Sequence, residues 1–102
     1  MDHRRIDERS LAFGRLIAAK VERDPSLIGV ARANLERWGK GCSPRLESTF
    51  AEWQAALDGP VEGVLHLLTA TEERAVRLRQ SNPFAGVLTE EERSAVIRGF
   101  AS

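Results

Sequence analysis

The chain has 102 residues, of which 42% are hydrophobic and 29% are charged, and its 15 basic and 15 acidic residues balance. This length suits one domain with a modest core, and the composition is far from that of disordered chains. A net charge of zero provides no overall field toward nucleic acid or an anionic membrane. Charge alone therefore favours neither class of partner.

The sequence also carries signals about its compartment. The N-terminal stretch is polar, and Arg15 and Lys20 interrupt the apolar stretch that follows, so we expect no signal peptide. No window approaches the roughly 20 apolar residues that a bilayer crossing requires. The single Cys42 rules out an internal disulfide. We expect a cytoplasmic protein that does not associate with a membrane.

Proline and glycine fall between amphipathic stretches and divide the chain into helical segments. The first segment, residues 4–23, has apolar residues at helical spacing: Ile6, Phe13, Leu16, Ile17 and Val21. Asp24 followed by Pro25 is a common helix start, because the aspartate accepts amide hydrogen bonds and the proline needs none. This second segment is predicted to end near Trp38, before the glycines that flank Lys40.

Ser43 and Pro44 repeat this helix start for a third segment. Its apolar residues step by four, three and four, which predicts a single-faced helix: Leu46, Phe50, Trp53 and Leu57. Residues 58–60 then open a short fourth segment with little polar surface and five apolar residues: Val61, Val64, Leu65, Leu67 and Leu68. We expect this fourth helix to lie centrally.

Thr69 or Thr71 can cap a fifth helix, in which Ala75, Val76 and Leu78 are the apolar positions. Thr89 and the three glutamates after it form a capping box that opens a last helix. No strand pattern of useful length occurs. The predicted fold is therefore all-α, a single helical domain over residues 1–102 built as a compact bundle of about five to six short helices.

Catalytic and metal-binding groups are sparse. The two histidines, His3 and His66, lie far apart, and neither Cys-x-x-Cys nor His-x-x-x-His occurs. Residues 39–43 lack the glycine spacing and the preceding strand of a phosphate-binding loop. We therefore predict a protein that is not an enzyme and has no metal or cofactor. An enzyme with His66 as its base stays as an alternative that requires a cleft around this residue.

A small DNA-binding transcriptional regulator is the main alternative function, because the second and third segments can form a helix-turn-helix. The third segment offers Arg45, Ser48 and Gln54, but two glutamates share its solvent side. A stronger basic patch is predicted on the fifth segment, where three arginines lie beside two glutamates: Arg74, Arg77 and Arg79. Nucleic acid is thus considered as a partner but is not favoured.

The connection before the last helix is unusual because it contains four apolar residues: Pro83, Phe84, Val87 and Leu88. Such residues either pack over the core as a lid or are presented to a partner. Together with Arg93 they are the candidate partner-binding residues. We also expect a homodimer, since short helices on a modest core often leave an apolar face to share.

Several stretches share the pattern of one group of proteins: residues 7–12, 58–68, 73–75, 78–81, 83–88 and 92–93. They resemble small bacterial helical proteins without an assigned activity, whose genes often lie beside those of nucleotidyltransferase-type proteins. That arrangement is similar to two-gene toxin and antitoxin modules. The group often has an aromatic residue where this chain has Ser94. The resemblance implies a non-catalytic interaction module, an antitoxin-like partner that binds a nucleotidyltransferase-type protein.

Overall fold

The computed structural model describes the backbone of residues 3–100 and the side chains of residues 8–99. Helices make up its regular structure, and no strand occurs within this range. In chain order the elements are α1 (His3–Arg23), the 3-10 turn η1 (Pro25–Leu27), α2 (Ile28–Gly39), α3 (Pro44–Asp58), α4 (Val61–Thr69), α5 (Glu73–Arg79) and α6 (Glu90–Phe100). The all-α prediction is confirmed. None of these helices combines the length and apolar character that crossing a membrane demands.

Most helices begin at the predicted starts, but Asp24 and Pro25 open the 3-10 turn η1, and α2 begins three residues later at Ile28. Asp24 accepts a hydrogen bond from the backbone N–H of Ser26 at 3.2 Å, and Ser43 Oγ accepts one from Leu46 N at 3.4 Å. The predicted capping box at α6 is also present. There Thr89 Oγ1 accepts from Glu92 N at 3.1 Å, while Glu92 Oε1 accepts from Thr89 N at 2.8 Å.

Helix α5 begins differently from the prediction. Its N-terminal flanking residue is Glu72, and no side chain caps it, so the predicted threonine caps are wrong. Thr69 belongs to the end of α4, where its hydroxyl donates to Leu65 O at 2.8 Å. That hydrogen bond turns the Thr69 hydroxyl back into α4 and away from the start of α5.

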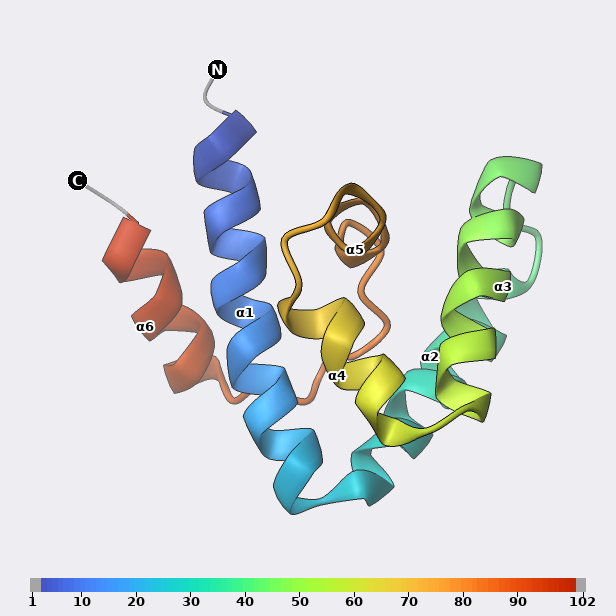
Figure 1. Ribbon diagram of the computed structural model, residues 1–102, viewed down its shortest axis with the longest axis horizontal. Coiled ribbons are helices and arrows are strands. Elements are labelled where there is room, and N and C mark those ends of the chain that lie inside the picture. The colour runs from blue at the N-terminus through green and yellow to red at the C-terminus, as the bar shows by residue number, and fades with distance from the viewer. Residues whose placement is uncertain (1–2, 101–102) are drawn as a thin grey trace.

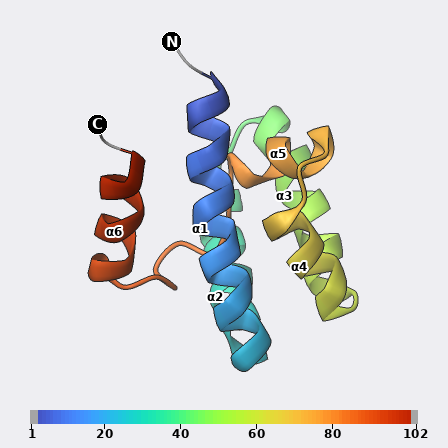
Figure 2. The same cartoon turned by 60° about the vertical axis from the view of Figure 1, so that its left-hand side comes forward.

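Helix α4 occupies the centre of the arrangement, as predicted. It packs against α1, α3 and α5, and Val64, Leu67 and Leu68 are buried. Figure 1 shows α4 between α1 on one side and the pair formed by α2 and α3 on the other. Helix α6 packs mainly against α1 and stands at the edge of the molecule, as Figure 2 shows.

The core brings together residues from α1 to α5 and one residue beyond them, Phe84. The rings of Trp53 and Phe84 meet edge to face, with centroids 6.3 Å apart and planes at 73°. The predicted apolar face of α3 is buried only in the later turns of the helix. Trp53 and Leu57 are buried, whereas Leu46 in the first turn is 39% exposed. Helix α4 follows directly on the C-terminal end of α3, and the first turn of α3 lies away from it (Figure 1).

Gly14 sets the distance between α1 and α4. A Cβ atom on Gly14 would lie 2.0 Å from Leu68 O and 3.0 Å from the Leu68 carbonyl carbon. Those atoms belong to the backbone of a central helix and cannot turn aside as a flexible side chain can. Only glycine therefore permits this helix crossing.

We predict that Gly14→Ala destabilises the protein by about 1–3 kcal/mol or more, because the methyl group must push α1 away from α4. Urea unfolding followed by circular dichroism measures this free energy. Gly29→Ala on α2 is the matched control, since a Cβ there meets no atom within 4 Å. The control is expected to be neutral or stabilising by at most about 1 kcal/mol. Equal effects of the two substitutions would contradict the close approach.

Candidate functional site

The apolar connection between α5 and α6, residues 80–89, crosses the molecule as a packed segment. Pro83 and Phe84 are buried, and Phe84 is only 1% exposed. Val87 and Leu88 are half-buried, and Arg93 on α6 is exposed. The five predicted partner-binding residues are thus divided, with two in the core and three reaching the surface.

Asn34 fastens this connection to α2. Its side chain is 4% exposed, and its amide nitrogen donates to Pro83 O at 2.8 Å and to Ala85 O at 3.0 Å. Arg37, one turn later, donates to the Asn34 amide oxygen. One amide therefore satisfies two carbonyls that would otherwise lack a donor in or near the core.

Lys20 fastens the end of the same connection to α1. Its ammonium donates to Val87 O at 3.0 Å and to Glu92 Oε1 at 2.5 Å. The hydrogen bond from Lys20, followed by those from Thr89, holds the pKa of Glu92 below its ordinary value of 4.5. Glu92 thus caps α6 and ties it to α1 at the same time.

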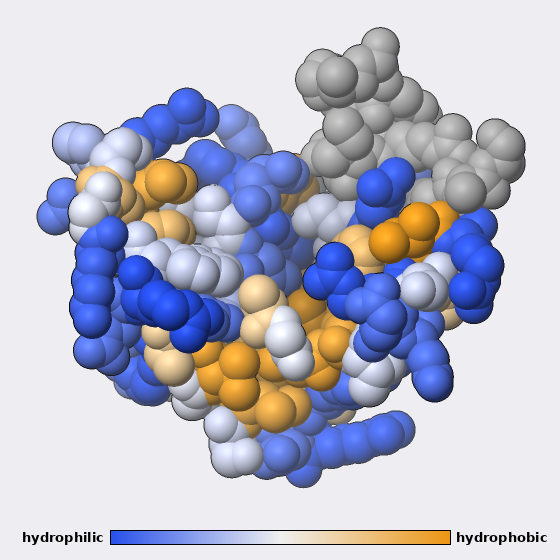
Figure 3. All heavy atoms as spheres, turned by 180° about the vertical axis from the view of Figure 1, so that it is seen from behind, coloured by the Kyte–Doolittle hydropathy of each residue, from blue (hydrophilic) through white to orange (hydrophobic). Residues whose placement is uncertain are grey.

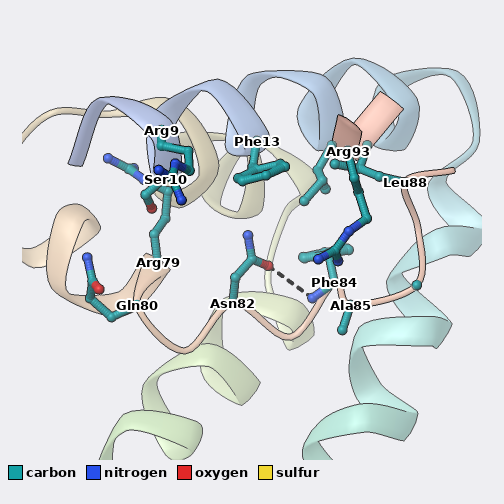
Figure 4. Close-up of a pocket in the computed structure, with 12 residues that line it drawn as sticks. Arg9, Ser10, Phe13, Arg79, Gln80, Asn82, Phe84, Ala85, Leu88 and Arg93 are labelled. Carbon is teal, nitrogen blue, oxygen red and sulfur yellow. Dashed lines mark hydrogen bonds between the residues drawn. The ribbon is translucent and has the colours of Figure 1, made fainter. Parts of the chain in front are cut away.

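A pocket of about 330 Å³ lies between α1, the α5–α6 connection and the start of α6. Figure 4 shows Phe13 of α1 above it and Asn82 and Phe84 of the connection below it. The hydrophobic and small residues that line it are Phe13, Ile17, Phe84, Ala85, Gly86 and Leu88. The polar ones are Arg9, Ser10, Arg79, Gln80, Asn82 and Arg93. No acidic side chain is among these lining residues.

The three arginines predicted to form a basic patch on α5 do not form one. Arg79 is 4% exposed, donates to Leu67 O at 2.8 Å and extends toward α1 along the pocket wall (Figure 4). Arg74 and Arg77 both bind Glu52 of α3, at 3.2 and 2.9 Å. The hydrogen bond from Arg77 is the largest cause of the lowered pKa of Glu52. The positive charge of α5 is therefore largely engaged within the protein.

His66 lies on the surface of α4, where its Nε2 pairs with a carboxylate oxygen of Glu72. It lines neither the pocket described above nor the shallow one between α2 and α3. Among the described side chains, no three His, Cys, Asp or Glu residues are grouped so that they could hold a metal ion. The pocket beside α1 thus brings polar and apolar side chains together without His66.

Comparison with protein-family models found no match to this chain, and comparisons with curated proteins and with solved structures found none either. Two residues that fasten the connection, Asn34 and Lys20, are not among the site residues predicted from the sequence. Each has a sequence signal, because Asn34 lies three residues after the apolar Ala31 and Lys20 lies three residues after the apolar Ile17, which is helical spacing.

We predict that Asn34→Ala destabilises the protein by about 2–3 kcal/mol, because it leaves two carbonyls of the connection without their donor. Chemical unfolding measures the loss. Gln54→Ala is the control, since the Gln54 amide donates to Asp58 at an exposed position, and its loss should cost about 0.5 kcal/mol or less. If Asn34→Ala were as mild as the control, the connection would not depend on this amide.

We also predict that the docking of α6 weakens in acid. Because folding lowers the pKa of Glu92, its contribution is complete above the ordinary value of 4.5 and is lost as the pH falls through the lowered folded value. Hydrogen exchange of the α6 amides across this range should show faster opening at low pH. Glu92→Gln should open α6 at neutral pH and flatten the profile, whereas Glu91→Gln should behave as wild type. A flat wild-type profile would contradict the prediction.

Proposed function

We propose that the chain is a non-catalytic protein-interaction module, an antitoxin-like partner that binds a nucleotidyltransferase-type protein. The observation that supports this proposal best is the partly apolar surface that the end of the connection and α6 leave uncovered. Leu88 and Arg93 meet at the pocket, and Ile97 follows Arg93 by one helical turn. We call these three residues the α6 strip.

The α6 strip has the composition of a binding surface. Ile97 is 43% exposed although it belongs to a helix that packs on α1, and Arg93 provides a charged fork beside it. Apolar groups next to an arginine are typical of interface positions that contribute strongly to affinity. Figure 3 shows further apolar side chains gathered on the face opposite to that of Figure 1, along which the connection runs.

DNA binding has less support from the contacts of the described residues. Its best candidate was the arginine patch of α5, but Arg74 and Arg77 share Glu52 as a partner and Arg79 is buried. Phosphate binding recruits several clustered cations whose charges are available to the phosphates. We therefore retain a cytoplasmic protein-binding role as the proposal.

The proposed function predicts that the chain co-elutes in size exclusion with a nucleotidyltransferase-type protein encoded beside its gene, after co-expression. Ile97→Asp should abolish this co-elution, because it places a charge in the α6 strip, while the circular dichroism spectrum stays that of the wild type. Leu46→Asp is the matched control, since Leu46 is 39% exposed on α3, outside the α6 strip. It should leave the complex intact.

Two results would contradict the proposal. One is failure of the wild-type chain to co-elute at both low and high salt. The other is an equal loss with Leu46→Asp and Ile97→Asp, which would place the contact elsewhere. Binding to DNA upstream of the gene that weakens steeply with salt would instead favour the regulator.

A further inference from the structure

We infer that the pocket between α1, the α5–α6 connection and α6 binds a small organic anion, with a phosphate monoester or carboxylate head on an apolar body. The volume of about 330 Å³ lies at the lower end of the range for small-molecule sites. The inference does not rest on the proposed protein partner. It rests on how charge, donors and aromatic surface are distributed around this pocket.

Two exposed arginines supply the charge. Arg9 projects from α1 and Arg93 from α6, and neither has an acidic partner among the described residues. In contrast, Arg32, Arg74 and Arg77 each bind a carboxylate. A guanidinium fork matches the geometry of carboxylate and phosphate oxygens. None of the described lining residues is acidic, so the charge that these residues offer to an anion is positive.

Asn82 adds a neutral donor on the floor of the pocket. Its amide oxygen accepts from the backbone N–H of Phe84 at 2.9 Å. Because that backbone group is a donor, the oxygen must face it, which leaves the amide NH₂ on the other side. Figure 4 shows this nitrogen pointing toward Phe13, into the pocket. The hydroxyl of Ser10 lies on the opposite wall, on α1.

Aromatic surface lies between the two arginines. Phe13 of α1 and the buried Phe84 line the pocket from above and below, and Leu88 closes it toward α6. An inorganic ion would leave this surface in contact with water, whereas an aromatic or aliphatic body would cover it. The arrangement therefore favours a ligand with one charged end and one apolar end over a simple anion or a polyanion.

The deciding experiment is an amide NMR titration of the isolated full chain with phenyl phosphate. Inorganic phosphate, phenol and phenylacetate serve as the comparison probes. We expect phenyl phosphate to shift the amide signals of residues 9–17 and 80–93. It should bind about tenfold or more tightly than inorganic phosphate, which lacks the apolar body, or phenol, which lacks the anionic head. If phenylacetate binds as tightly as phenyl phosphate, a carboxylate is sufficient as the head group of the ligand. If phenylacetate binds much more weakly, the pocket selects a phosphate head group.

Matched variants assign the charge to the pocket. Arg9→Gln and Arg93→Gln should each weaken phenyl phosphate binding by about fivefold or more, whereas Arg15→Gln on α1 and Arg98→Gln on α6 should change it less than about twofold. Arg15 and Arg98 are also exposed but are not among the lining residues of the pocket. Equal losses at all four positions, equal binding of phenol, or no shifts at millimolar probe would overturn the inference. None of these outcomes bears on the co-elution test, so the two proposals fail separately.

Discussion

The fold depends on hydrogen-bond donors for the backbone carbonyls of a segment that packs partly into the core. Where such a carbonyl is buried, water does not reach it, and it needs a partner from the protein. Trp53 Nε1 donates to Leu78 O at 2.8 Å just before the α5–α6 connection, and Asn34 and Lys20 donate to carbonyls within it. These three donors come from α3, α2 and α1. These hydrogen bonds therefore tie the end of α5 and the connection to three different helices.

The same anchoring creates the candidate site. Because the Asn34 amide holds the connection below α1, Phe84 enters the core and Asn82 faces the pocket. Because Lys20 holds Glu92, α6 begins beside α1, and Arg93 comes to line the same pocket as Arg9. Arg9 and Arg93, 84 positions apart in the chain, thus line one pocket because of contacts that Asn34 and Lys20 make.

Local signals were enough to predict the helices but not the contacts between them. Proline starts, glycine stops and the capping box act within one turn, and the structure has them where the sequence places them. Arg79 shows what local signals cannot predict. Its place among the arginines of α5 predicted an exposed side chain, yet this side chain is buried beside α1. Only the position of α1 over α5 determines this, and Gly14 makes that position possible. The prediction that Leu46 belongs to a buried face is wrong for the same reason. Helical periodicity does not tell which turns of α3 have a neighbouring helix.

Helix α6 is the least anchored of these elements, and both proposed functions use it. It packs mainly on α1, and its ion pair with Lys20 is partly exposed, so its undocking should cost less free energy than global unfolding. An anion held between Arg9 and Arg93 would bridge α1 and α6 and favour the docked state. A protein partner that recognises α6 only when docked would gain affinity from that ligand, and by linkage the ligand would gain the same factor from the partner. Leu88 and Arg93 belong both to the pocket and to the α6 strip, so the two proposals place their ligands on one continuous surface.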